Sequence, residues 1–248
     1  MGATKAVLLT LMLVPFTMTR GQAVEFLQSL VLGSGGDRTL KVSFNEKALA
    51  DVHASLVEAL GVKPKTQVTL SASKPSGQSL LSRFASVYAG ADSNDLFVGV
   101  CVAGWKTDPL RPGFVSVAGF HRDTITADYL LNFLQFLPTY DAVIFMIFPS
   151  RADFPLDIIK TTGTKGGGGK YFVVVRTQER TTFENLVEAF LDALEESLVG
   201  KNADVDKDSF LSFSEWLQEL STISAVSKVS LVPYKISDAP DLKIRQLK

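Results

Sequence analysis

Oxygen-bearing side chains in the segment DVDKDSFLSFSE (204–215) have the spacing of calcium ligands in an EF-hand loop. Such a loop binds calcium through side-chain oxygens at its first, third, fifth, ninth and twelfth positions and through a backbone carbonyl at its seventh. The residues at these positions are Asp204, Asp206, Asp208, Ser212, Glu215 and, for the carbonyl, Phe210. The spacing therefore predicts a calcium site with the expected number of oxygen ligands.

Two features of this segment weaken the calcium prediction. Its sixth position is Ser209, where a glycine normally permits the sharp turn, so we expect an unfavourable φ angle and weak affinity. The sequence also offers no second EF-hand with which the loop would pair. In an alternative interpretation, Asp204 to Asp208 form an acidic, solvated turn that caps the following helix. Calcium binding and simple capping both remain open.

Two apolar segments end where an enzyme would present reactive side chains. They are DLFVGVCVAGW (95–105) and DAVIFMIFPS (141–150). Each is predicted to be a strand that breaks into a turn, and open α/β sheets hold catalytic groups at the carboxyl ends of such strands. Here the turns offer Trp105, Phe148 and Pro149, which include neither a nucleophile nor a base. We therefore expect no catalysis, and we expect these side chains and Ser150 to line a pocket that binds a partner.

The periodicity of apolar residues indicates the elements that would carry these groups. Short runs that are mostly apolar on both faces predict buried strands at 5–14, 66–72, 96–103, 142–148, 171–176 and 228–232. Apolar residues at three- and four-residue steps predict helices at 45–60, 79–89, 126–136, 182–199 and 212–220. Strands that alternate with helices indicate a single α/β domain whose mostly parallel sheet has helices on both faces. Turn-rich or glycine-rich segments at 33–38 and 161–170 are predicted loops.

Composition and charge disfavour several classes of protein. The chain of 248 residues is 46% hydrophobic, which is ample for a core, and its net charge of −1 gives no overall field for nucleic acid or anionic lipid. The single cysteine, Cys101, excludes an internal disulfide and fits a reducing compartment such as the cytoplasm. The apolar run at 6–16 is too short to span a bilayer, and we expect it to form a buried strand, not a secretory signal.

The order of these elements and the residues between them resemble a degenerate metacaspase, from the caspase-fold cysteine peptidases, along nearly the whole chain. In that family a Ser-Gly-His-Gly turn carries the catalytic base, and this chain has Ala103, Gly104 and Trp105 there. The family's Asp-(Ser/Cys)-Cys-His-Ser-Gly motif is replaced by MIFPSR (146–151), so that Phe148 stands at the nucleophile. YFVVVRTQERTTFENLVEAFLDALEE (171–196) and LSFSEWLQEL (211–220) resemble a later strand and two later helices of the family.

The resemblance implies a caspase-like domain at 1–235 that has lost peptidase activity, followed by an extended tail at 236–248. Such a pseudoenzyme is expected to be a structural or protein-binding component of a larger assembly. A cytoskeletal or flagellar partner and a cytoplasmic location are the corresponding expectations. No cofactor is implied, and calcium is the one ion that the sequence suggests.

Two alternatives to a purely binding role remain open. The chain would be a calcium-responsive regulator if the segment 204–215 binds the ion. It would be a cysteine peptidase with a displaced catalytic site if Cys101 acted together with His121 or His53. Ser150 follows a strand and a proline, but no Gly-x-Ser-x-Gly elbow surrounds it, and we interpret it as a turn serine.

Overall fold

The computed structural model describes residues 24, 26–33, 46–61, 63–71, 80–102, 105–107, 115–120, 123–147, 168–177, 183–199 and 204–246. The helices are α1 (Glu46–Leu60), α2 (Leu80–Gly90), α3 (Ala127–Phe136), α4 (Phe183–Val199) and α5 (Phe213–Val226). The strands of the main sheet are β1 (Phe26–Gly33), β2 (Lys63–Ser71), β3 (Asp95–Val102), β7 (Asp141–Ile147), β8 (Gly169–Thr177) and β10 (Val229–Asp238). Short strands elsewhere are β4 (Trp105–Thr107), β5 (Val115–Phe120), β6 (Asp123–Thr126), β9 (Phe210–Ser212) and β11 (Lys243–Gln246).

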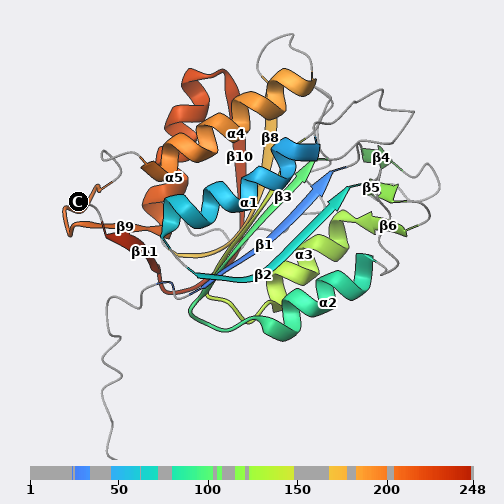
Figure 1. The fold of residues 1–248 in the computed structure, drawn as a ribbon, viewed down its shortest axis with the longest axis horizontal. Coiled ribbons are helices and arrows are strands. Elements are labelled where there is room, and N and C mark those ends of the chain that lie inside the picture. Colours follow the sequence, from blue (N-terminus) through green and yellow to red (C-terminus); the bar gives the residue numbers. More distant parts are fainter. Residues whose placement is uncertain are drawn as a thin grey trace, which may run out of the picture.

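The six strands of the main sheet lie in the order β10-β8-β7-β3-β1-β2. All neighbours are parallel except β10, which pairs antiparallel with β8 at the edge. Helices α1, α4 and α5 cover one face of the sheet, and α2 and α3 cover the other (Figure 1). This arrangement confirms the predicted single α/β domain with a mostly parallel sheet and helices on both faces.

Side chains of each buried strand alternate between two hydrophobic cores. In β7, Val143, Phe145 and Ile147 join the core beneath α1, α4 and α5, whereas Ile144 and Met146 join the core beneath α2 and α3. Both faces of β7 are therefore buried along its whole length. This double burial explains the continuous apolar run from which the strand was predicted, because a strand covered on both faces has no solvent side to make polar.

The first described strand of the sheet is not the one expected from the sequence. The predicted strand at 5–14 lies outside the described residues, whereas β1 lies between β3 and the edge strand β2. The periodicity did not indicate β1, because Gln28 and Ser29 interrupt its apolar residues.

The carboxyl-terminal segment is part of the fold, which corrects the expected division into a domain at 1–235 and an extended tail at 236–248. The boundary falls inside β10, and β11 pairs antiparallel with β9. Leu242 and Ile244 are buried in the same core as α1, α4 and α5. The segment is extended, as expected, but its apolar side chains pack within the chain.

The predicted glycine-rich loop at 161–170 ends earlier than expected, because Gly169 and Lys170 already belong to β8. Gly169 has a φ of 139°, and a Cβ atom there would lie 2.1 Å from the carbonyl oxygen of Ser237 on β10. Glycine is therefore required at this position by conformation and by the close approach of the two strands.

Among the described helices, none is both long enough and apolar enough to cross a membrane.

Candidate functional site

The carboxyl ends of β3 and β7 lie side by side, as expected for the two strands whose following turns would hold the catalytic groups in an enzyme. The strands are parallel neighbours, and Val102 at the end of β3 lies opposite Ile147 at the end of β7. Trp105 follows as the first residue of β4, where it pairs with Val117 of β5. The other predicted pocket residues, Phe148, Pro149 and Ser150, lie outside the described residues, as does His121. The apolar pocket at this edge therefore stays a prediction.

Cys101 is unsuited to act as a nucleophile. Its side chain is fully buried in the core beneath α2 and α3, and this burial raises the pKa of the thiol to about 12. The thiolate is the reactive form of cysteine, so the thiol has neither access to a substrate nor the ionisation that attack requires. His53 belongs to α1, whose residues Val52 and Leu56 pack into the core on the opposite face of the sheet. The sheet thus separates the helix of His53 from Cys101, which contradicts a displaced catalytic pair formed by these two residues.

The acidic segment at 204–215, called the loop below, follows α4 and includes a turn, the strand β9 and the first three residues of α5. Asp204, Asp206 and Asp208 each bring a carboxylate oxygen within 4.8 Å of the others. The loop lies at the end of the sheet with β9 and β11, opposite the end marked by β4, β5 and β6 (Figure 1). It is therefore separate from the carboxyl edge of the strands.

Hydrogen bonds from the loop backbone hold these carboxylates in place. The amide of Asp208 donates to Oδ1 of Asp204 and to Oδ1 of Asp206, each at 3.1 Å. The amide of Ser209 donates to Oδ2 of Asp204 at 3.1 Å, and the amide of Phe210 donates to Oδ1 of Asp208 at 2.8 Å. Each carboxylate oxygen has more than one lone pair, so these bonds leave the group able to accept a cation as well.

The backbone at the sixth loop position adopts the conformation that the sequence predicted to be unfavourable. Ser209 has a φ of 68°, in the left-handed region where glycine normally lies. Lys207 also has a positive φ, at 62°. The turn therefore forms without glycine and holds two non-glycine residues in a costly conformation.

Glu215, the predicted twelfth ligand, caps the next helix and organises the loop. Its Oε1 accepts from the amides of Val205 and Asp206, at 2.7 and 3.2 Å, and its Oε2 accepts from the amide of Ser212 at 2.9 Å. The Ser212 hydroxyl in turn accepts from the amide of Glu215, which completes a capping box at the start of α5. The start of α5 is therefore capped by Ser212 and Glu215, and not by Asp204 to Asp208 as the alternative interpretation expected. A cation would have to share Glu215 with these amides.

A lysine that sequence spacing did not reveal already supplies positive charge to the loop. The Lys243 ammonium lies 2.6 Å from Oδ2 of Asp208 and 4.1 Å from the centre of the Phe210 ring. This hydrogen bond is the main reason that the pKa of Asp208 is lower than its usual value. Lys243 comes from β11, far along the chain from the loop, so no local pattern could have indicated it. A metal ion at this loop would compete with its ammonium group for Asp208.

Strand β11 pairs with the loop, for which the sequence offers no second EF-hand. Leu211, at the eighth loop position, is fully buried and pairs with Arg245 of β11. Asp241, just before β11, accepts hydrogen bonds from the amide of Ser214, at 3.0 Å, and from its hydroxyl. The carboxyl-terminal segment therefore braces both the loop and the first turn of α5.

A cavity of about 590 Å³ adjoins the loop, between α5 and the strands β7, β8 and β10. Its apolar lining is formed by Phe145, Tyr171, Val173, Val205, Leu217, Leu231 and Pro233. Its polar lining is formed by Asp206, Ser212, Ser214, Glu215, Gln218, Ser221 and Asp241. The size and mixed lining are typical of sites that bind small molecules or side chains. Because five residues of the segment 204–215 line this cavity, a change in the loop would alter its wall.

Comparison with known proteins supports the fold and nothing finer. No family model matches the sequence, and no curated protein is significantly similar to it. The Drosophila initiator caspase Dronc matches the structure with a TM-score of 0.54 at 11% identity, over 91% of this chain and 84% of that one. The Geobacter sulfurreducens protein GSU0716 matches with a TM-score of 0.52 at 11% identity, over 90% of this chain and 99% of that one. The chain therefore has a caspase-like fold.

Proposed function

We propose that this chain is a non-catalytic caspase-like domain that acts by binding other proteins. The observation that carries the proposal is the burial of Cys101, the single cysteine of the sequence, in the core beneath α2 and α3. In the sequence, Trp105 and Phe148 stand at the positions where the resembled family has its base and its nucleophile. With no accessible thiolate, the fold has lost the group from which cysteine peptidase chemistry begins.

A role as a component of a larger assembly follows from this proposal. A protein that keeps a folded domain without its chemistry retains function through contacts, and a cytoskeletal or flagellar partner in the cytoplasm stays the prediction for this chain. Recovery of the tagged protein in a stable complex tests the assembly. Recovery as a free monomer from every cell fraction would contradict it.

The native protein is expected to cleave no peptide that carries a basic residue at the scissile bond, and its thiol should not react. Because the thiol is fully buried and burial raises its pKa to about 12, a thiol-reactive probe should label Cys101 only after the chain unfolds. Labelling is followed by mass spectrometry with and without denaturant. Cys101→Ala is the matched control, and cleavage by the wild type that this variant abolishes would overturn the proposal.

We propose calcium-responsive regulation as a second function, on the observation that Asp204, Asp206 and Asp208 converge within 4.8 Å in a loop with a positive φ at Ser209. The strained turn and the competing Lys243 ammonium favour a weak site. The dissociation constant is expected on the order of 10⁻⁴ to 10⁻³ M, the range of weak EF-hand modules.

Lys243→Met should tighten calcium binding by about three- to tenfold, because it removes the ammonium that occupies Asp208 and keeps a side chain of similar length. Calorimetric titration of calcium into the wild type and the variant measures the change. Lys207→Met, which removes an equal charge from an exposed position of the same loop, is the control and should have the smaller effect. Absence of heat from all three proteins at millimolar calcium would remove the regulatory function.

A further inference from the structure

Helices α1 and α4 enclose a shallow groove of about 180 Å³ on the outer side of the sheet. Its floor is formed by Val52 and Leu56 of α1 and by Leu191, Leu194 and Leu198 of α4. Along α4 the groove runs from position 188 to position 198, which corresponds to about 15 Å of helix axis. The groove is therefore too small for a typical cofactor but long enough to receive several side chains of one partner segment.

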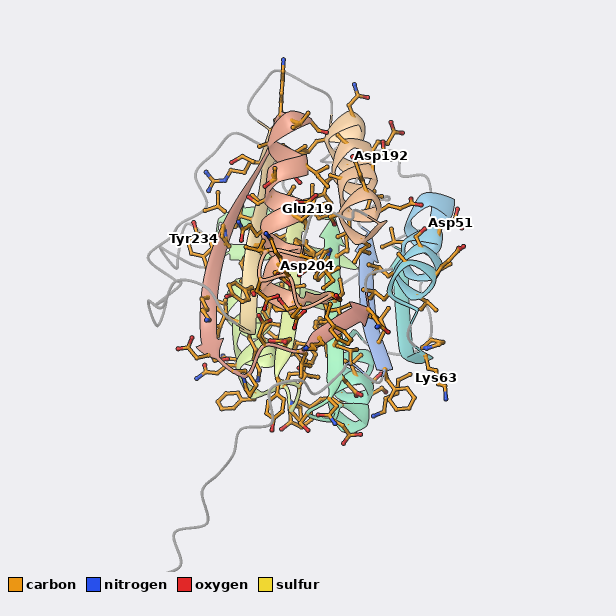
Figure 2. The ribbon with its side chains drawn as sticks, turned by 90° about the vertical axis from the view of Figure 1, so that its left-hand side faces the viewer. Asp51, Lys63, Asp192, Asp204, Glu219 and Tyr234 are labelled. Carbon is orange, nitrogen blue, oxygen red and sulfur yellow. The ribbon has the colours of Figure 1, made fainter. Side chains whose placement is uncertain are left out.

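The rim of this groove carries only negative charge. Asp51 on α1 and Glu188, Asp192 and Glu195 on α4 line it, and all four are exposed. Figure 2 shows Asp192 and Asp51 on the outer surfaces of the two adjacent helices. Within the described parts of the chain, none of the four carboxylates has a lysine or arginine as a salt-bridge partner.

The charge of the whole chain is strongly segregated toward this face. Helices α1 and α4 together contain eight acidic residues and one basic residue, a net charge of −7 in a protein whose net charge is −1. α4 by itself contains no lysine or arginine. An anionic membrane or a nucleic acid would be repelled from such a surface, whereas a cationic segment would be attracted to it.

A helical partner segment suits this groove better than an extended one, because an extended segment would find no free backbone groups in the groove with which to hydrogen-bond. The groove lies between two helices whose amide and carbonyl groups are already hydrogen-bonded within each helix, so it offers no sheet edge to a strand. A helix brings its own backbone bonds and presents apolar residues at three- and four-residue steps to the floor. Lysine or arginine on its flanks would then face the acidic rim.

We propose that the α1–α4 groove binds a basic amphipathic helix of a partner protein, through leucine-like side chains on its floor and lysine or arginine at its rim. This inference rests on the proposal that the chain acts by binding proteins, and it names the chemistry of the partner. The rim contacts are exposed and screened by salt, so the complex depends strongly on ionic strength.

The test uses the full-length protein and a fluorescent helical peptide of leucine and lysine, about 15 residues long so that a helix is accessible to it. Fluorescence anisotropy should show binding that weakens at least about tenfold between about 0.05 M and 0.5 M salt. A matched peptide with glutamate in place of lysine should not bind. Equal binding of both peptides would overturn the proposal.

Variants of α4 locate the binding site. Asp192→Lys should weaken binding about fivefold or more, because it replaces an attraction at the rim with a repulsion. Glu196→Lys makes the same charge change at an exposed position of α4 outside the groove, and its effect should be smaller. Leu191→Gln should weaken binding by a similar factor through loss of apolar contact. If Glu196→Lys weakens binding as much as Asp192→Lys, the groove is not the site.

The same peptide separates failure of this inference from failure of the proposed function. A peptide that is bound and left intact supports both. A peptide that the protein cleaves would overturn the non-catalytic function. A peptide that is neither bound nor cleaved would overturn only the groove and would leave binding at another surface.

Discussion

The wild-type protein is expected to lose stability as the pH rises from about 4 to about 7, and Asp141→Asn is expected to remove this pH dependence. Asp141 is the first residue of β7, and its side chain is fully buried. Burial raises the pKa of its carboxyl from 3.8 to about 7. Backbone hydrogen bonds from Leu242 and Gly169 offset part of this effect.

The direction of the pH dependence follows from where the proton is held more tightly. The folded protein keeps the Asp141 proton up to about pH 7, whereas the unfolded chain releases it near 3.8, so between these values the folded state binds more protons. The contribution of Asp141 protonation to the free energy of unfolding is complete below a pH of 3.8, and it is lost as the pH rises through about 7. At about 1.4 kcal/mol per pKa unit, the loss is on the order of 4 kcal/mol.

The same substitution has a second, pH-independent cost. Oδ1 of Asp141 accepts from the amide of Gly169 at 2.5 Å, and Oδ2 accepts from the amide of Leu242 at 2.7 Å. Asparagine has one oxygen, so one of these buried amides loses its acceptor, at a cost of about 1–3 kcal/mol. Urea unfolding should therefore show the variant less stable than the wild type at about pH 4 and more stable than the wild type at about pH 8.

Asp192→Asn is the control for this experiment, because Asp192 is exposed on α4. It removes an acid without disturbing the buried network and should keep the pH dependence of the wild type. If Asp141→Asn unfolds with the same pH dependence as the wild type, then Asp141 does not carry the buried proton. The hydrogen bonds that join Asp141 to β8 and to the carboxyl-terminal segment would then stabilise the fold without making its stability depend on pH.

The helices and most buried strands could be predicted because their signals are local. Three- and four-residue apolar spacing indicated α1 and α4 almost to the residue, and continuous apolar runs indicated β3, β7 and β8. β1 gave no such signal, because polar residues interrupt its middle. The strand order was also hidden, since crossover connections decide which strands become neighbours and no short pattern encodes them.

The candidate sites also contain some residues that the sequence could predict and others that only the fold brings together. The loop at 204–215 was found because all of its predicted ligands lie within one short segment. Lys243 and Asp241 were missed because the fold brings them to the loop from the carboxyl-terminal segment. The acidic rim on α4 is visible in the sequence, but the groove exists only because α1 packs beside α4. Local chemistry was predictable, and its tertiary partners were not.

Trp216→Ala is expected to lower the free energy of unfolding by about 3–5 kcal/mol, a large part of the stability of an ordinary domain. Trp216 lies on α5 and is fully buried, with its ring centroid 5.8 Å from that of Phe213 and 6.2 Å from that of Phe145. Its Nε1 donates a hydrogen bond to Oγ of Ser197 on α4 at 3.0 Å. One side chain thus joins α5, α4 and β7.

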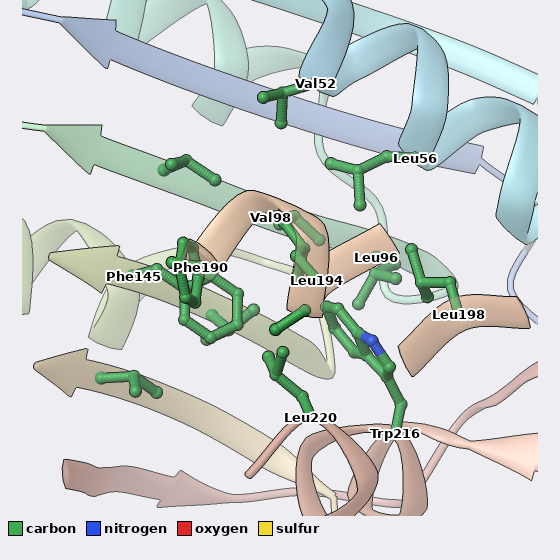
Figure 3. Close-up of a cluster of buried hydrophobic side chains, with 14 of the residues drawn as sticks. Val52, Leu56, Leu96, Val98, Phe145, Phe190, Leu194, Leu198, Trp216 and Leu220 are labelled. Atoms are coloured by element: carbon green, nitrogen blue, oxygen red, sulfur yellow. The ribbon is translucent and has the colours of Figure 1, made fainter. Parts of the chain in front are cut away.

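The Trp216 environment also supports the proposed binding groove from beneath. Figure 3 shows the indole beside Leu194 and Leu198, which line the groove on their other side. Removal of the indole should therefore loosen α4 and weaken binding of the basic helical peptide without any change at the rim.

Trp216→Phe provides a folded comparison in case the alanine variant is too unstable to purify. It keeps an aromatic ring in the core and removes the hydrogen bond to Ser197, so it should cost about 1–2 kcal/mol. Phe136→Ala, which truncates an aromatic residue that is 65% exposed on α3, should change stability by less than about 0.5 kcal/mol. Urea unfolding of the wild type and the three variants measures the loss of unfolding free energy that each substitution causes. If Trp216→Ala were no more destabilising than Phe136→Ala, α4 and α5 would not be held together through this core, and the groove would need another support.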